Sequence, residues 1–289
     1  MLRSKLLGTD FSRLKKFVPL WLNYLLLCNY AGRYICTGQI REFGVITRIR
    51  NNLWQVGGRG LTDPADAAVY LVRFGDKAAL IDAGTGRDQP QLRKNIAECL
   101  EPNVQLEYLL LTHCHFDHTG GAQAVRDEYG CKIVAHELDA VYLESGDNRV
   151  TGAVLYGARL EPFAIDIKLR GQETTLAIGN GIVTAIHCPG HSPGSVVYTT
   201  DIDGELVLLG QDIHGPIHSE FLSDEKQYLA SLARLVDLNA DLLLEGHFGI
   251  FETKQEVREF IEYWGSSRGN SLYGFLYVSP SEPPGRGGY

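Results

Sequence analysis

The sequence predicts an α/β protein, and three observations lead to that class. Short apolar runs bounded by turn residues alternate with segments of helical spacing from about residue 40 onward. The composition, 44% hydrophobic and 21% charged over 289 residues, is that of a globular chain able to bury a large core. Clusters of histidine and aspartate come directly after apolar strands, where functional side chains usually emerge on loops.

The elements follow in order along this pattern. Apolar runs and alternation predict strands over residues 44–50, 53–56, 68–74, 78–81, 106–111, 132–135, 165–169, 173–178, 182–187, 196–200, 206–209 and 242–244. Apolar residues at helical spacing predict helices over residues 90–100, 122–129, 136–144, 224–238 and 255–264. The pair Gly75-Asp76 between two strands is typical of a hairpin turn. Residues 145–161 contain three glycines and are expected to be irregular.

The charge distribution argues against a protein that binds nucleic acid. The chain has 27 Lys and Arg against 35 Asp and Glu, a net charge of −8. Residues 1–30 carry +4, so the rest of the chain carries −12 and lacks the basic runs that bind phosphate backbones. Six cysteines form no CxxC pair, which favours reduced thiols in a reducing compartment. We therefore expect a small-molecule substrate and no nucleic-acid partner.

The chain is predicted to have three parts: an N-terminal extension over residues 1–40, a catalytic domain over 41–265 and a C-terminal tail over 266–289. The extension has basic residues followed by an apolar stretch, the order of a signal peptide, but no small-x-small cleavage site follows. Its twelve-residue apolar stretch, 17–28, is too short for a transmembrane span, which needs about 20 residues. We expect the extension to cover a surface or a second subunit in a homo-oligomer. Cytoplasmic localisation is predicted, with export or membrane-surface association as alternatives.

The segment 112–118, of sequence THCHFDH, carries the strongest chemical signal in the chain. Strand alternation is expected to place His113, His115 and Asp117 on one side, with the following turn bringing His118 round. Four polar groups at the end of a buried strand would be costly without partners. Imidazole nitrogens and carboxylate oxygens are ligands of zinc, iron and manganese. The segment therefore predicts a metal site.

This segment resembles the signature of the metallo-β-lactamase superfamily, and three further segments follow in that family's order. His191 lies in CPGHSPGS, Asp212 in GQD and His247 in EGH, each just after a predicted strand. The resemblance covers about residues 42–264. It implies a four-layer αββα sandwich, in which two mixed β-sheets are flanked by helices.

The resemblance also implies two metal sites that share one ligand. Its ligand groups are His113, His115 and His191 for the first ion, Asp117, His118 and His247 for the second, and Asp212 as the bridge. The expected cofactors are two divalent ions, zinc first, with iron or manganese as alternatives. Asp117 would also be the catalytic residue that orients the attacking hydroxide or passes on a proton. Asp82 matches the family's strand-end aspartate and would orient a ligand imidazole, a plain turn residue being the alternative.

The implied reaction is hydrolysis of an ester, thioester or lactone by a hydroxide that bridges the metals. With an aspartate at position 212, the ligand set resembles that of the thioesterase, lactonase, phosphodiesterase and ribonuclease branches of the superfamily. Two alternatives stay open within the family, a mononuclear iron oxygenase similar to persulfide dioxygenases and a phosphodiesterase. A third is a non-catalytic binding module on the same fold. Tyr156, Arg159, His214 and His218 are candidates for substrate contact, with ordinary loop positions as the alternative.

Overall fold

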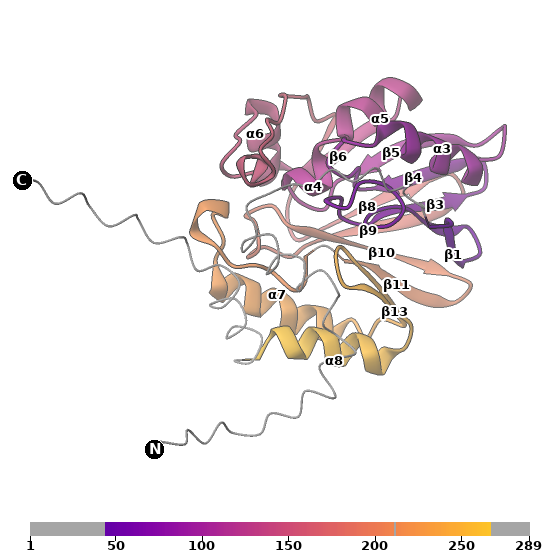
Figure 1. Cartoon of the computed structure of the whole chain (residues 1–289). Coiled ribbons are helices and arrows are strands. Elements are labelled where there is room, and N and C mark those ends of the chain that lie inside the picture. The colour runs from indigo at the N-terminus through magenta and orange to yellow at the C-terminus, as the bar shows by residue number, and fades with distance from the viewer. Residues whose placement is uncertain (1–43, 211, 267–289) are drawn as a thin grey trace, which may run out of the picture. The chain divides into compact units, whose positions relative to one another are not determined.

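The computed structural model describes residues 44–210 and 212–266, which form two β-sheets with helices on their outer faces (Figure 1). The predicted extension over residues 1–40 lies outside the described residues, as does the predicted tail apart from Ser266. Among the described residues, no helix combines the length and apolar character needed to cross a membrane.

The first sheet has seven strands that neighbour one another in chain order. These strands are β1 (Thr47–Arg50), β2 (Leu53–Gly57), β3 (Val69–Phe74), β4 (Lys77–Ile81), β5 (Gln105–Leu110), β6 (Lys132–His136) and β7 (Ile167–Leu169). The first four pair antiparallel and the last four parallel, so the sheet is mixed. The hairpin predicted at Gly75-Asp76 is confirmed by the pairing of β3 with β4.

The second sheet has six strands in the order β13-β12-β11-β10-β9-β8. These strands are β8 (Glu173–Ile178), β9 (Gly181–His187), β10 (Val196–Ile202), β11 (Glu205–Leu209), β12 (Leu242–Glu245) and β13 (Gly249–Phe251). Only β11 and β12 pair parallel, and their carboxyl ends therefore lie at one edge. The short strand β13 was not predicted, because three residues are too few to show a period.

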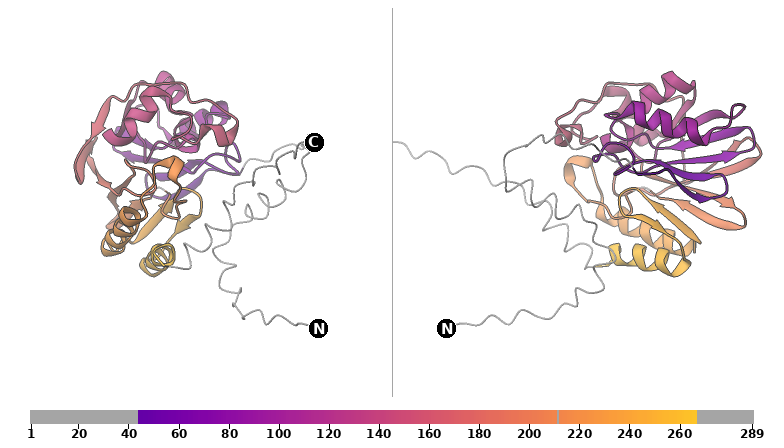
Figure 2. Two further views of the ribbon diagram at one scale, coloured as in Figure 1. Left: turned by 90° about the vertical axis from the view of Figure 1, so that its left-hand side faces the viewer. Right: turned by 45° about the vertical axis from the view of Figure 1, so that its right-hand side comes forward.

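Helices cover the outer face of each sheet, which confirms the four-layer αββα sandwich (Figure 2). The helices are α3 (Gln89–Cys99), α4 (Phe116–Thr119), α5 (Ala122–Tyr129), α6 (Glu137–Ser145), α7 (Glu225–Asp237) and α8 (Lys254–Trp264), with 3₁₀ turns η1 (Ala153–Tyr156) and η2 (Ser219–Phe221). In Figure 2, α3 and α5 lie outside the first sheet and α7 and α8 outside the second. Residues 145–161 are therefore only partly irregular, since η1 and the end of α6 lie within them.

Strand alternation in β3 builds two separate cores. Val69 and Leu71 join a buried cluster with residues of α3 and α5, outside the first sheet. Tyr70 and Val72 point the other way, into a cluster shared with the second sheet. Side chains of successive strand residues face opposite sides, so one strand serves both layers. These two cores fix the positions of the two sheets. They therefore also fix the strand ends that carry the polar motifs.

Candidate metal centre

The seven residues predicted as metal ligands converge on loops at the carboxyl ends of strands. His113 and His115 follow β5, and His191 lies between β9 and β10. Asp212 follows β11, and His247 lies between β12 and β13. Asp117 and His118 are carried by the short helix α4, directly after the loop with His113. All seven are buried except His247, which is partly exposed.

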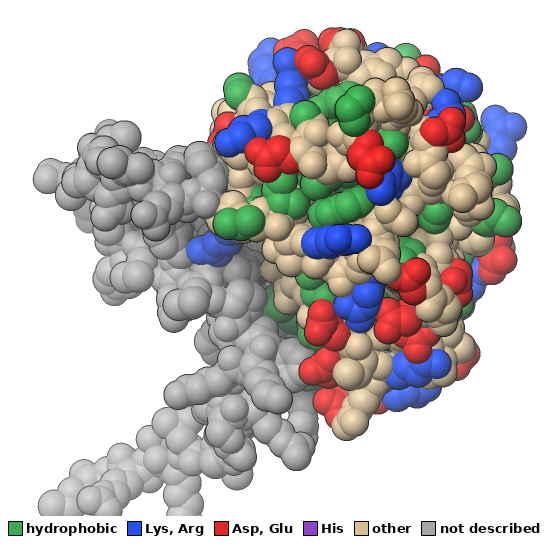
Figure 3. All heavy atoms as spheres, turned by 90° about the vertical axis from the view of Figure 1, so that its right-hand side faces the viewer, with side chains coloured by type: hydrophobic (Ala, Val, Ile, Leu, Met, Phe, Trp, Pro, Cys, Tyr) green, Lys and Arg blue, Asp and Glu red, His purple; other side chains and the backbone are tan. Residues whose placement is uncertain are grey.

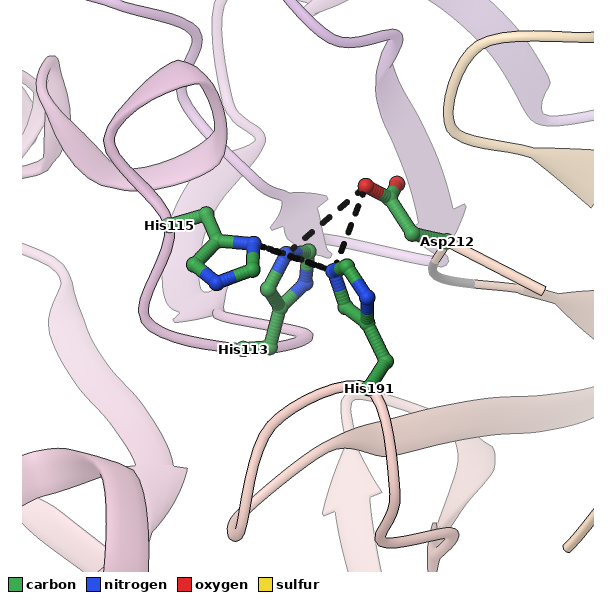
Figure 4. Close-up of side chains that lie close together, drawn as sticks. All are labelled: His113, His115, His191 and Asp212. Atoms are coloured by element: carbon green, nitrogen blue, oxygen red, sulfur yellow. Dashed lines mark hydrogen bonds and ion pairs between the residues drawn. The ribbon is translucent and has the colours of Figure 1, made fainter. Parts of the chain in front are cut away.

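The first cluster consists of His113, His115, His191 and Asp212 (Figure 4). His115 Nδ1 lies 3.0 Å from the Nε2 atoms of both His113 and His191, and those two Nε2 atoms are 3.3 Å apart. Asp212 Oδ2 is 3.4 Å from His191 Nε2 and 4.0 Å from His113 Nε2. Figure 4 shows the three rings pointing at one another, with the carboxylate at the edge of the group. The first cluster is therefore a convergence of nitrogens rather than a set of separate side chains.

In His113 and His191, a hydrogen bond at Nδ1, on the side of the ring away from the cluster, determines that the inward-facing Nε2 carries no proton. His191 Nδ1 lies 2.8 Å from the carbonyl oxygen of Pro216, which can only accept, so Nδ1 donates. Thr112 donates its hydroxyl proton to Asp82 and accepts from His113 Nδ1 at 3.1 Å. In the neutral rings both Nε2 atoms therefore present lone pairs to each other at 3.3 Å. Facing lone pairs repel unless a cation lies between them, so this geometry fits a metal ion.

The second cluster consists of Asp117, His118 and His247. His118 Nε2 and His247 Nε2 are 3.3 Å apart, and Asp117 Oδ2 lies 3.2 Å from His247 Nε2. His118 Nδ1 is 2.7 Å from Asp82 Oδ2, which directs its Nε2 toward the cluster. Two imidazoles and one carboxylate fit the mixed nitrogen and oxygen coordination of zinc and similar ions.

Asp212 of the first cluster also contacts the second, because its two carboxylate oxygens face different sets of imidazoles. Its Oδ2 faces His113 and His191, as described above, whereas its Oδ1 lies 3.1 Å from His118 Nε2 and 3.3 Å from His247 Nε2. Burial raises the pKa of Asp212, but the imidazoles of His247 and His118 outweigh it, and the pKa lies well below its ordinary value. Asp212 is therefore a carboxylate in contact with both clusters.

The imidazole pKa values divide the two clusters. Burial lowers the pKa of His113 and His115 well below the ordinary value, and the neighbouring imidazoles lower it further. Burial also disfavours charge on His118 and His247, but Asp212 and other carboxylates outweigh it in both. The pKa of His118 is raised well above its ordinary value, and that of His247 is raised to about 10. His113 and His115 of the first cluster are thus neutral imidazoles, whereas the second cluster attracts positive charge.

Asp82 supports the site through an unusual backbone conformation. It follows β4 with φ of +60°, in the left-handed region that aspartate tolerates better than most residues. This conformation lets its carboxylate accept from the backbone and hydroxyl of Thr112 and from His118 Nδ1. The prediction that Asp82 orients an imidazole agrees with this contact.

Two buried carboxylates that sequence reasoning missed hold the loops of the clusters. Asp139 of α6 accepts from the amides of Cys114 and Gly194 and from the Ser192 hydroxyl, at 2.6–2.9 Å. It therefore ties the loop of His113 and His115 to the loop of His191. Glu245 accepts from the amides of His247 and Phe248 at 2.7 and 2.8 Å. An isolated acid in a helix or strand carries no signal in one sequence, so only the fold reveals these contacts.

Two glycines allow the backbone to approach the ligands closely. A β-carbon at Gly246 would come within 2.7 Å of Asp212 Oδ1 and 3.1 Å of His118 Cε1. Gly190, just before His191, has φ of +136° and lies against the backbone of Tyr228. Glycine is therefore required at position 246 because a side chain would clash there. At position 190 it is required both by the close neighbours and by the backbone conformation.

The structure corrects one geometric prediction and refines another. Asp117 does not share a side with His113 and His115 through strand alternation, because α4 starts at Phe116 and turns the chain. It joins His118 and His247 instead. His214 is buried with its Nδ1 2.8 Å from Glu245 Oε1, so its imidazole is engaged within the protein.

Two other residues proposed for substrate contact, Tyr156 and His218, pack against aromatic rings. The Tyr156 ring lies 5.7 Å from Phe116, with the guanidinium of Arg87 over its face. The His218 ring lies 5.4 Å from Phe221. Arg159 is exposed.

A mixed double-sheet sandwich with paired His/Asp clusters at its strand ends defines a metal-dependent hydrolase class. The family model described as the metallo-β-lactamase superfamily matches residues 62–247, more than half of the chain. The chain belongs to this superfamily, and the prediction from its motifs is confirmed.

Curated relatives and solved structures agree with this family. The lactamase-like protein aptB of Emericella nidulans is 27% identical over 84% of this chain and 71% of its own length. The acyl-coenzyme A thioesterase MBLAC2 of Gallus gallus is 27% identical over 66% of this chain and 76% of its own. The subclass B3 enzyme BJP-1 of Bradyrhizobium japonicum has 19% identity and a TM-score of 0.64, covering 83% of this chain and 98% of its own. At this identity the structural likeness shows the fold.

Proposed function

We propose that this chain is a dinuclear metal-dependent hydrolase of thioesters and related esters or lactones. The observation that carries the proposal is the position of Asp212, whose two oxygens face different clusters. A single carboxylate between two sets of imidazoles is suited to bridge two ions. Each cluster contributes three further ligand atoms, which leaves room for water and substrate.

The proposed ligands are those of the two clusters, with Asp212 shared. Two divalent ions bound there would polarise the substrate carbonyl and lower the pKa of a water molecule toward neutrality. Zinc is the proposed metal because nitrogen-rich sites with one or two carboxylates suit it, and iron or manganese are the alternatives.

Asp117 is proposed as the catalytic residue. Burial raises its pKa, but the charges of His118 and His247 outweigh burial and hold it at about 2, so it is a carboxylate at neutral pH. A carboxylate beside the attacking water can orient that water and accept its proton. Asp117 would then deliver the proton to the departing sulfur or oxygen.

The proposed substrate is a small acyl compound rather than a polyanion. An acyl-coenzyme A thioesterase is among the relatives of similar length, which supports a thioester. On the face drawn in Figure 3, acidic and basic side chains are interspersed rather than gathered into a basic patch. With a net charge of −8, this surface offers little attraction to nucleic acid.

The division into residues 1–40, 41–265 and 266–289 is part of the same proposal. We propose that residues 1–40 mediate homo-oligomer contacts outside the catalytic domain, in a cytoplasmic protein. Deletion of these residues would then lower the mass measured by light scattering while turnover per chain stays unchanged. An unchanged mass together with lost binding to lipid vesicles would contradict this assignment.

The experiment that tests the function combines metal analysis with a substrate panel. Protein purified without chelator should contain two zinc ions per chain and hydrolyse thioesters, esters or lactones. One iron per chain with oxygen consumption on glutathione persulfide would establish a dioxygenase instead. Turnover confined to phosphodiesters would reassign the substrate, and a metal-loaded protein inert on the whole panel would point to a binding module.

A further inference from the structure

Exposed apolar side chains gather on three neighbouring elements beside the first cluster. Among the described residues, seven large apolar side chains are exposed, and five of them come from α6, η1 and the residue after η2. These five, here called the apolar rim, are Leu138, Val141, Val154, Leu155 and Leu222, each 45–64% exposed. Single exposed apolar residues are ordinary on a protein surface, whereas a group of them marks a binding site.

The rim is continuous with the metal centre through Phe221 of η2. The ring of Phe221 lies 4.4 Å from the ring of His115, a first-cluster residue. The same ring packs on Gly152, just before η1, where a β-carbon would come within 3.3 Å of it. An ion pair of 3.3 Å between Arg149 and Glu220 links the same two segments.

A cavity of about 460 Å³ lies between α6, the loop of His191 and the start of α7. This volume is within the range of roughly 300–1,000 Å³ of small-molecule sites. Leu138 and Leu222 of the rim both line it, together with Gly190 and Ser192, the neighbours of His191. The cavity therefore lies against the loop that carries His191, a proposed ligand of the first ion.

Most polar side chains around this cavity are already bonded within the protein. Ser192 donates to Asp139, Ser223 donates to the carbonyl of His191, and Gln227 donates to Asp224. These groups do not need a polar ligand to satisfy them. The groups that gain most from being covered are the leucines of the rim, through removal of their surface from water.

Leu222 adds a second, independent observation. It has φ of +57°, a conformation that costs a branched apolar residue about 1 kcal/mol or more, and its side chain is 45% exposed. Asparagine or glycine would occupy this backbone position with less strain. A strained apolar residue held at the mouth of a cavity is consistent with a side chain that contacts a ligand.

We propose that the apolar rim and the adjoining cavity bind the acyl chain of the substrate, so that the enzyme prefers medium to long acyl groups. The carbonyl would lie at the metal centre, with the chain running past Phe221 toward Leu138 and Leu222. This inference rests on the proposed function and names the part of the substrate that the site recognises.

The test compares acyl thioesters from acetyl to dodecanoyl, on coenzyme A and on N-acetylcysteamine. The wild-type kcat/KM should rise about two- to fourfold for each added methylene, because each buried CH₂ lowers the free energy of the bound state. The double variant Leu138→Ser with Leu222→Asn should flatten this rise, so that its kcat/KM depends little on chain length. Asparagine suits the left-handed backbone, so this variant is expected to fold.

A matched control is Ile182→Ser, which removes another exposed apolar side chain, 59% exposed, at the start of β9. It should leave the chain-length profile as in the wild type. A wild-type profile that is flat despite measurable turnover, or a double variant that keeps the full slope, would overturn the proposal. A lower mass of the double variant in light scattering with an unaltered profile would also overturn it, because a second copy would then cover the rim.

A binding measurement separates this inference from the proposed function. Calorimetry with dodecanoate should show at least tenfold weaker binding to the double variant than to the wild type and to Ile182→Ser. This difference would support the rim even if no thioester were hydrolysed, in which case only the proposed function fails. Equal binding to all three proteins would refute the rim as an acyl site.

Discussion

The two His/Asp clusters lie side by side but differ in charge and surroundings. The first is buried, and its imidazoles His113 and His115 have pKa values lowered by burial and by neighbouring imidazoles. The second has a partly exposed His247 and carboxylates that raise its imidazole pKa values. Neighbouring groups rather than residue type therefore decide the protonation of each histidine. His113 and His115 offer free lone pairs at neutral pH, whereas the second cluster must release protons before it binds a cation.

The largest effect is expected from the residue that the clusters share. Asp212→Ala should reduce kcat/KM by more than about 100-fold, beyond the cost of losing an outer-shell partner, because both of the proposed ions would lose a ligand. Metal analysis should show loss from both clusters. Asp241→Ala, at the other end of the same sheet, is the control and should keep turnover and metal content. Full activity of the Asp212 variant would refute the shared role.

Substitution of the two supporting carboxylates, Asp139 and Glu245, should change the metal affinity of the two clusters differently. Asp139→Asn should weaken the first ion by about 10- to 100-fold and spare the second, because an amide cannot accept all three hydrogen bonds of the carboxylate. Glu245→Gln should do the reverse, since Glu245 holds the backbone of His247. Stepwise cobalt titration, followed by absorbance, measures the two affinities. Equal loss at both positions in both variants would show that the clusters do not bind independently.

The pH dependence of metal binding should also differ between the clusters. His247, with a pKa of about 10, is protonated at neutral pH and must lose its proton when it binds a metal. Affinity at the second cluster should therefore rise by about tenfold per pH unit for each proton released, between about pH 7 and 9. His113 and His115 of the first cluster should contribute no such rise, because their lowered pKa values leave both rings neutral. Calorimetry in buffers of different ionisation enthalpy counts the protons.

The smallest effect on the site is expected at a histidine outside both clusters. His136 stacks on His187 with ring centres 3.9 Å apart, and burial, with His187, lowers its pKa to about 4. A lowered pKa means that the unfolded chain binds a proton more readily between about pH 4 and 6.5, so stability falls with acidification there. His136→Phe should remove up to about 3 kcal/mol of that pH-dependent loss and leave metal content unchanged. Chemical denaturation of both proteins at several pH values measures the difference.

The predicted strands and helices agree with the observed elements to within a few residues where the periodic pattern is long. The helix over 122–129 and the strand over 173–178 have the observed bounds. Three short elements were missed, namely α4, η2 and β13, which span three or four residues each. One turn of helix shows no repeat in the sequence, so the strand alternation was extended as far as Asp117. The direction of the Asp117 side chain was therefore predicted wrongly.

The sequence by itself determined the family and the types and order of the candidate ligands, because histidines and aspartates after apolar strands are local signals. Only the tertiary structure decided how they group, since β9, β11 and β12 end at one edge of the second sheet, beside the loop that follows β5 of the first sheet. It also decided the opposite protonation of the two clusters, which depends on carboxylates from distant segments. The roles of Asp139 and Glu245 and the apolar rim have the same origin. Each depends on distances between segments that no local pattern encodes.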